Sequence, residues 1–219
     1  MINFTDEDFL AAIDTYTKSR HLDARYSSFD FCFNYFQRAR MGGELEKLID
    51  RENQEKTCLH LGFYLASWGM MRGSADLLQQ SAHKLLPVVE YLVGQDEEIW
   101  KIDADSIGSS VEEIKRLSSG IRKAFGPGVR VTDTLTTKII LGVMGSVPAF
   151  DTYFMKGFKC STFGEKSLKR IGAFYDEHAE AIDSIRLPTL DFVTGDETDI
   201  LYSKSKLIDM AFFSLGFGG

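Results

Sequence analysis

Hydrophobic residues recur every three or four positions along almost the whole chain, which is the spacing of one face of an α-helix. A clear example is the stripe formed by Phe29, Cys32, Phe33 and Phe36. Alternating patterns typical of strands are confined to 129–131 and 191–194, pieces too short to anchor a sheet. The pattern therefore predicts an all-α fold of roughly eight to ten helices.

The order of the predicted helices follows from this spacing and from the residues that begin or end a helix. The first has about a dozen residues after Thr5, where Asp8 completes a variant capping box. The others are expected within 27–41, 52–72, 74–93, 97–102, 111–125, 134–143, 148–154, 168–185 and 207–215. Pro87 is expected to bend the helix over 74–93, and Thr132 or Thr134 to cap the helix that follows the turn at 126–128.

The segment 52–72 is apolar on every side beyond Leu59, which predicts a central helix surrounded by the others. Trp68 and Arg72 close this segment. The arginine is expected either to cap the helix or to point into a cleft. A compact domain around this helix is predicted, with two helical lobes as an alternative arrangement.

Composition agrees with one globular domain over residues 1–219. Apolar residues make up 44% of the chain and charged residues 26%, which is enough for a packed interior. Cys32, Cys58 and Cys160 are far apart and lie among apolar neighbours, as expected for reduced core thiols. No apolar run reaches the length of a membrane span, and the first residues do not resemble a secretory signal. A cytoplasmic protein without a membrane partner is predicted.

Charge is distributed unevenly although the whole chain carries −7. Residues 114–170 include eleven basic and three acidic side chains, a net charge of +8, which leaves 14 basic and 29 acidic residues, or −15, elsewhere. This division predicts a basic lobe over 111–170 and an acidic body over 1–110 and 171–219. The alternative is that these basic side chains pair within the molecule and form no continuous surface.

A basic surface on an acidic protein attracts a polyanion or an acidic partner. The first functional hypothesis is therefore a helical binding module whose basic lobe contacts nucleic acid or an acidic protein. Its candidate binding residues are Gly126, Gly128, Arg130, Lys138, Lys156, Lys159, Lys169 and Arg170. A structural homo-oligomer that associates through exposed aromatic residues is another alternative. Common metal, hydrolase and nucleotide motifs are absent from the sequence, so no cofactor and no metal are expected.

The segment 126–154 carries a more specific pattern. A predicted helix ends at Gly126-Pro127-Gly128, a second contains Thr137-Lys138-Ile139, and the chain then reads Val147-Pro148-Ala149-Phe150-Asp151. This order resembles the helix-hairpin-helix DNA glycosylase superfamily over about thirty residues.

The resemblance implies roles for individual residues. Gly126 and Gly128 would face a DNA phosphate, and Asp151 would be the catalytic carboxylate of an enzyme that cleaves a glycosidic bond. The lysine of the bifunctional members corresponds to a position near Thr132, so the resemblance does not assign that role to Lys138. From the residues alone, Asp151 is also explained as a carboxylate at the start of a helix. Whether the protein is an enzyme is left open at this point.

Overall fold

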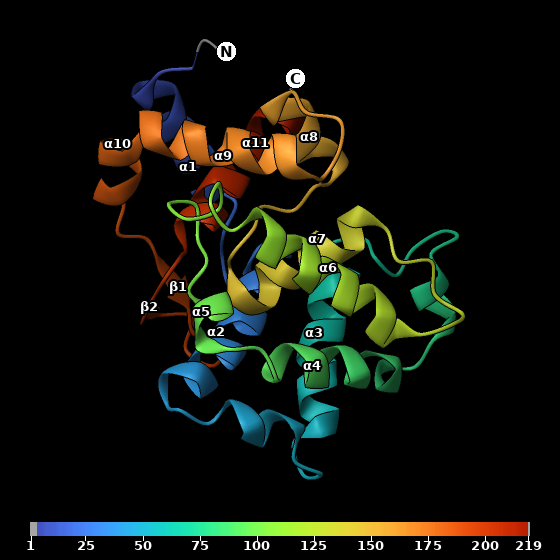
Figure 1. Cartoon of the computed structure of the whole chain (residues 1–219). Helices are drawn as coiled ribbons and strands as arrows, with labels where there is room; N and C mark the ends of the chain where they lie inside the picture. The colour runs from blue at the N-terminus through green and yellow to red at the C-terminus, as the bar shows by residue number, and fades with distance from the viewer. Residues whose placement is uncertain (1–3, 219) are drawn as a thin grey trace.

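The structure is a computed structural model that describes residues 4–218, and helices form most of it (Figure 1). In this range the α-helices are α1 (Asp6–Thr17), α2 (Ser27–Met41), α3 (Gln54–Ser67), α4 (Leu86–Val93), α5 (Glu97–Trp100), α6 (Val111–Phe125), α7 (Asp133–Met144), α8 (Thr152–Phe158), α9 (Glu165–Glu177), α10 (Ala179–Ser184) and α11 (Lys204–Gly218). The all-α prediction is confirmed, with eleven α-helices in the described range where eight to ten were expected.

The helices form two groups that meet at α7 (Figure 1). Helices α1, α8, α9, α10 and α11 lie together at the end of the molecule that carries both termini. Helices α2, α3, α4 and α6 pack at the other end, and α2, α3 and α6 each contact α7. The sequence did not predict this grouping, because each group combines segments from distant parts of the chain.

Helix α7 is the central helix of the fold. Every residue from Leu135 to Met144 is buried, including Lys138. The prediction that 52–72 forms the surrounded helix is wrong, because Leu59 and Phe63 of α3 are 52% and 66% exposed. These two side chains are four residues apart and form an apolar stripe on the outside of α3. Hydropathy alone does not separate such a stripe from a core face.

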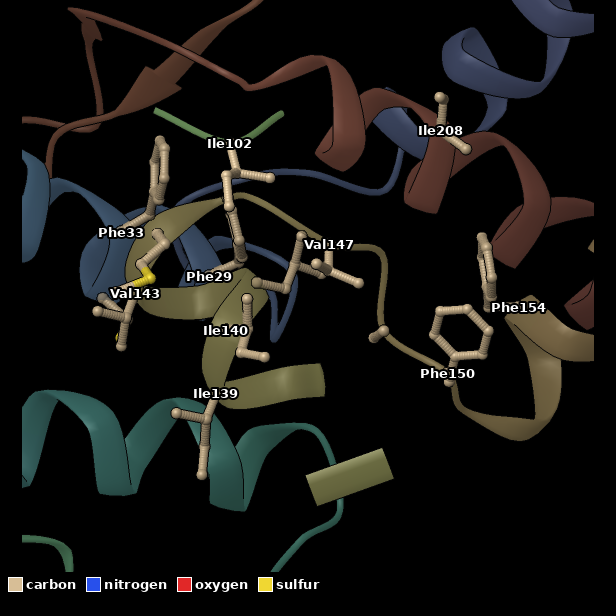
Figure 2. Packing of buried hydrophobic residues seen from close by; sticks show 14 of the residues in the cluster. Phe29, Phe33, Ile102, Ile139, Ile140, Val143, Val147, Phe150, Phe154 and Ile208 are labelled. Carbon is tan, nitrogen blue, oxygen red and sulfur yellow. The ribbon is translucent and has the colours of Figure 1, made fainter. Parts of the chain in front are cut away.

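Figure 2 shows how α7 joins the two groups of helices. Ile139 points toward α3, while Ile140 and Val143 lie among side chains of α2 such as Phe29. Beyond the end of α7, Phe150 and Phe154 face each other, with ring centroids 5.3 Å apart. One continuous apolar core therefore extends from α3 to α8.

Several predicted helix ends are confirmed. Thr5 and Asp8 form the capping box of α1, and the hydroxyl of Thr132 accepts a hydrogen bond from the Leu135 N–H at the start of α7. The long helix over 74–93 is wrong. Its first half forms two short 3-10 helices, Asp76–Gln79 and Ala82–Leu85, and α4 begins only at Leu86, next to Pro87. Proline has no N–H to donate, so it starts this helix instead of bending it.

The stripe over 168–185 is also divided. Helix α9 ends at Glu177 and α10 begins at Ala179, with His178 between them. The His178 ring packs against Phe174 and its Nδ1 lies 2.6 Å from a carboxylate oxygen of Asp6 on α1. The helical spacing of hydrophobic residues therefore continues across the break at His178, which the contact with Asp6 of α1 stabilises.

A two-stranded antiparallel sheet was not predicted. It pairs β1 (Pro188–Leu190) with β2 (Glu197–Leu201). Helix α2 holds β1, since the Asn34 Nδ2 donates to the Leu190 carbonyl and the Leu190 N–H donates to the Asp30 carboxylate, both at 2.9 Å. These partners are more than 150 residues apart, so no local pattern reveals them.

Helices α8 and α11 approach more closely than side chains allow. A methyl group placed on Gly157 would lie 2.0 Å from the Phe212 carbonyl oxygen, and one on Gly216 would lie 1.9 Å from that of Tyr153. The two backbones therefore touch at a pair of glycines. Within 4–218, none of the helices has both the length and the apolar character needed to cross a membrane.

Candidate functional site

A pocket of about 250 Å³ lies where the end of α3, the face of α7 and the start of α8 meet. We call it the Asp151 pocket. Its lining comes from five separate stretches of sequence: Arg25, Ala66, Ser67, Trp68, Gly69, Met70, Arg72, Thr134, Lys138, Asp151, Thr152, Tyr153 and Phe213. The fold thus brings Arg25 of the α1–α2 connection, several aromatic side chains and the Asp151 carboxylate to one small pocket.

Lys138 and Asp151 form an ion pair in the wall of this pocket. The Lys138 Nζ lies 2.9 Å from an Asp151 carboxylate oxygen and also donates to the Trp68 carbonyl at 3.2 Å. The lysine side chain is 4% exposed and the aspartate side chain 13% exposed. Removing charges to the interior is costly unless they are paired, so each residue depends on the other. The carboxylate is the member of the pair with more access to the pocket.

The start of α8 fixes the position of Asp151. One carboxylate oxygen accepts hydrogen bonds from the N–H groups of Tyr153 and Phe154, both at 3.0 Å, which makes Asp151 the N-cap of the helix. The other oxygen binds Lys138. The interpretation as a helix-start carboxylate is therefore confirmed. It does not exclude chemistry, since a cap held by three donors is also a rigid carboxylate.

Trp68 forms the centre of a cluster of cations. Its ring centroid lies 5.3 Å from the Arg25 Cζ, 5.3 Å from the Lys138 Nζ and 5.6 Å from the Lys206 Nζ. Aromatic faces attract cations, and two of these three cations, Arg25 and Lys138, line the pocket with Trp68. The indole Nε1 is buried and has no hydrogen-bond partner in the described part of the chain.

Arg72 was expected either to cap its helix or to point into a cleft. It lies beyond the end of α3 and lines the Asp151 pocket, where its side chain passes over Gly69. Gly69 has φ +80°, and a methyl group there would lie 2.9 Å from the Arg72 Nε. Across residues 4–218, neither Arg72 nor Arg25 forms an ion pair with an acidic side chain. The ionisable lining thus carries three positive charges and one negative charge.

A second pocket, of about 580 Å³, continues from the first. The two share Gly69, Met70 and Arg72, and the second extends to Val129 and Arg130 in the turn between α6 and α7. The candidate phosphate residues Gly126 and Gly128 lie in this turn, exposed, with φ +61° and +89°. A carboxylate oxygen of Asp76 accepts a hydrogen bond from the Arg130 N–H at 2.6 Å. A carboxylate within the protein therefore already binds an amide of this turn.

The other candidate binding residues lie away from the Asp151 pocket lining. Lys169 pairs with Glu165, and Arg170 donates to the carbonyls of Phe158 and Lys159 at the end of α8. Lys156 lies on the exposed side of α8, and Lys159 has φ +54° as its C-cap. Of the eight candidates, only Lys138 contributes to the pocket that contains Asp151.

Local pairing neutralises much of the basic segment. Lys115 lies within 4 Å of Glu112 and Glu165, Arg116 pairs with Glu113, and Arg122 pairs with Asp133. With the pairs of Lys138 and Lys169, at least five of the eleven basic side chains have an acidic partner. The contacts therefore show intramolecular pairing, and a continuous basic face is not established by them.

A second buried lysine–aspartate pair lies behind Trp68. The Lys206 Nζ on α11 is 2.9 Å from an Asp209 carboxylate oxygen and 3.2 Å from the Tyr16 hydroxyl. The other Asp209 oxygen accepts the Ala149 N–H at 2.9 Å. Both residues are almost fully buried. This pair holds the segment that leads to Asp151 but does not line the pocket.

Asp30 on α2 is a further ionisable group in the core. It accepts hydrogen bonds from the Tyr202 hydroxyl and the Leu190 N–H, and an Arg20 nitrogen lies 3.8 Å away. Burial nevertheless raises the pKa of the Asp30 carboxyl to about 6. Asp30 is absent from the linings of the pockets described above, so its ionisation concerns the core.

A pocket of about 420 Å³ between α1 and α11 is larger than the Asp151 pocket but brings together a single charged side chain, Asp8. Two other larger pockets are mostly apolar. They have volumes of about 690 and 580 Å³, lie between α2 and α3, and share Phe31, Lys56, His60 and Phe192. Their linings contain no buried ion pair of the described chain, and burial raises the pKa of the Cys32 thiol in one of them, which disfavours its reactive thiolate form. Among residues 4–218, no three His, Cys, Asp or Glu side chains are grouped to hold a metal ion. The Asp151 pocket is therefore the stronger candidate.

Sequence reasoning missed Arg25 in this site. It is a single arginine in a polar connection, and no local pattern distinguishes it. Trp68 was assigned to a central core helix, but it lies just beyond α3 and is only partly buried. In comparisons with known proteins, no family model matches this chain, and no curated protein or solved structure is significantly similar to it.

Proposed function

We propose that the protein is an enzyme that acts on nucleic acid and cleaves an N-glycosidic bond, with Asp151 as the essential carboxylate. The observation that carries this proposal is the Lys138–Asp151 pair in a pocket flanked by Arg25 and Arg72. The resemblance of 126–154 to helix-hairpin-helix DNA glycosylases gives the class of reaction. The structure adds the pocket to that resemblance.

The size and lining of the pocket fit one nucleotide base. Its volume of about 250 Å³ is below the roughly 300–1,000 Å³ of sites for drug-sized ligands. Trp68 and Tyr153 offer aromatic surfaces for stacking, and Tyr153 is 38% exposed. An enzyme that acts on a base in a duplex turns that nucleotide out of the stack into such a pocket.

The chemistry follows from a fixed negative charge beside the sugar. As the bond between C1′ and the base nitrogen breaks, its electron pair stays on the base, and a proton from solvent neutralises the base. Positive charge develops on the sugar, and the Asp151 carboxylate stabilises it. Water then adds to C1′ and releases a proton. The hydrogen bonds that hold Asp151 in place reduce the movement needed during this step.

The test measures base release from duplex and single-stranded DNA that carries damaged or mismatched bases. The native chain is compared with Asp151→Asn, which keeps an oxygen for capping α8 but removes the charge. Base release by the native chain and a loss of at least 100-fold in Asp151→Asn are expected, in line with the loss of one charge-stabilising group.

Asp133→Asn is the matched control. Asp133 also lies at the start of a helix and pairs with an arginine, but it is exposed and outside the Asp151 pocket. This variant is expected to retain native activity. Equal base release by native protein and Asp151→Asn, or none by either on the whole panel, would sink the proposal.

A further measurement addresses Lys138. Borohydride reduction of a mixture with abasic DNA captures an imine between a lysine amine and C1′ of the sugar. Capture that disappears in Lys138→Met would assign Lys138 as a nucleophile. Base release without capture would leave Lys138 as the partner that positions Asp151.

A further inference from the structure

Arg25 and Arg72 lie at the Asp151 pocket, and neither has an anionic partner among residues 4–218. The Arg25 Cζ lies 5.3 Å from the Trp68 ring centroid and 5.4 Å from that of Tyr26. The Arg72 side chain lies over Gly69, the next residue after Trp68. The two guanidinium groups therefore contact neighbouring residues, Arg25 the Trp68 ring and Arg72 the Gly69 backbone, and both residues line the same pocket.

The arrangement concentrates positive charge. Lys138 is neutralised by Asp151, and Lys206 behind Trp68 is neutralised by Asp209. The two arginines are the cations of this cluster without an acidic partner in the described chain, so the lining has a net charge of +2. Both arginines line the same pocket, so an anion bound there is attracted by the charge of both.

We propose that Arg25 and Arg72 bind the phosphate group of a nucleotide whose base and sugar enter the Asp151 pocket. This inference rests on the proposed function, which it makes more specific. Guanidinium groups donate two parallel hydrogen bonds to phosphate oxygens, a geometry that an ammonium group lacks. The phosphate belongs either to a strand of nucleic acid or to a free nucleotide, and both share this chemistry.

The chain contains a spectroscopic reporter for this binding. It has two tryptophans, Trp68 in the pocket wall and Trp100, which is 2% exposed and lies outside the pocket. In a Trp100→Phe background, Trp68 is the single source of tryptophan fluorescence. A ligand that enters the pocket or displaces Arg25 from the ring changes its emission.

The experiment titrates this background with inorganic phosphate, adenosine, adenosine 5′-monophosphate and a short single-stranded oligodeoxynucleotide. Binding of the monophosphate or the oligonucleotide at least 10-fold tighter than adenosine is expected. Arg25→Gln and Arg72→Gln should each weaken that binding at least 10-fold, since each removes charge-assisted hydrogen bonds. The double glutamine variant, with both changes, should bind more weakly than either. Preference for the oligonucleotide identifies a strand as the source of the phosphate, and preference for the monophosphate a free nucleotide.

Two controls separate binding from folding. Both arginines are exposed and have no acidic partner within the described range, so their glutamine variants should shift the urea unfolding curve by less than about 1 kcal/mol, the value of an exposed contact between a cation and a ring. Arg25→Lys with Arg72→Lys keeps the charge and removes the two-pronged geometry, and we expect it to restore only part of the affinity. Arg116→Gln, on the surface of α6, should bind as the native chain does.

The outcomes for the two proposals differ. Adenosine binding as tightly as its monophosphate, or unchanged affinity in the double glutamine variant, would overturn the phosphate site. If that variant releases bases with unchanged KM and kcat, the phosphate site is rejected but the glycosidic activity stands. Phosphate-dependent binding without base release supports the site and removes the proposed reaction.

Discussion

Two lysine–aspartate pairs lie near Trp68, and they differ in their access to a ligand. Lys138–Asp151 and Lys206–Asp209 each have a nitrogen–oxygen distance of 2.9 Å, and each lysine lies close to the Trp68 ring. Asp151 also accepts two backbone N–H groups, and Asp209 accepts one. The first pair lines the Asp151 pocket and the second does not. Burial and pairing are therefore common to both pairs, and access to a ligand distinguishes the site from the core.

The largest effect on stability is expected from breaking the core pair. Lys206→Met leaves the Asp209 carboxylate buried without its cation. Removing one partner of a buried ion pair typically costs about 3–5 kcal/mol of the free energy of unfolding. Urea unfolding measures this loss. Lys169→Met, which breaks an exposed pair with Glu165, is the matched control and should cost less than about 1 kcal/mol. Similar losses in both variants would show that Lys206 does not depend on pairing.

The pH dependence of stability sharpens the same comparison, because Asp30 is an ionisable group of the core. Its pKa is raised to about 6 in the folded protein, whereas an unfolded aspartate titrates near 3.8. Protonation therefore stabilises the fold below pH 4, and this contribution is lost as the pH rises through about 6. Two pKa units correspond to about 3 kcal/mol.

Asp30→Asn isolates that contribution. The free energy of unfolding of the variant, relative to the native chain, should rise by about 3 kcal/mol between pH 4 and pH 7. Chemical denaturation across this range measures the difference. A difference that is constant with pH would contradict the role assigned to Asp30.

The pocket pair should be less important for stability than the core pair. Asp151→Asn leaves Lys138 without its anion, but the Trp68 carbonyl and the new asparagine oxygen can still accept hydrogen bonds from the ammonium. We expect a loss of about 1–3 kcal/mol, between the values for exposed and buried pairs. The double variant Lys138→Met with Asp151→Asn removes both charges and should recover part of that stability while base release stays lost. Full activity in the double variant would place catalysis elsewhere.

The smallest effect concerns Gly69. Gly69→Ala forces a side chain onto a backbone with φ +80° and pushes against the Arg72 Nε. The left-handed conformation costs about 1 kcal/mol for alanine, and Arg72 can move because its end is flexible. The expected result is a loss of about 1 kcal/mol in urea unfolding together with weaker binding of adenosine 5′-monophosphate. Native binding would show that the position of Arg72 is unimportant.

The parts of this site that depend on neighbouring residues could be predicted from the sequence. Helix α7 and the Thr132 cap follow from periodicity and capping rules, and both occur in the structure. The helix expected within 148–154 begins later, at Thr152, with Asp151 as its cap. Asp151 and Lys138 were each named as candidates. Their pairing was not predicted, since it depends on how the chain between α7 and α8 turns back, which hydrogen bonds to Asp209 and Thr137 determine.

The distant part of the site could not be predicted. Arg25 approaches Trp68 only because the α1–α2 connection packs against the end of α3, and single arginines in connections have no characteristic pattern. For the basic segment, the sequence showed the charge but not the partners of the charged side chains. Its charge is evident in the sequence, but the ion pairs of Arg116 and Lys169 with neighbouring glutamates depend on helix geometry and rotamers.

The contact of α8 with α11 through Gly157 and Gly216 has a consequence for how this protein can change during evolution. Any side chain at either position would separate the two helices, because each glycine faces a backbone carbonyl of the other helix. Separation would move the start of α8, and with it the carboxylate of Asp151. Relatives that retain the same site should therefore keep both glycines, or change both together with compensating substitutions nearby, although the two residues are far apart in the sequence.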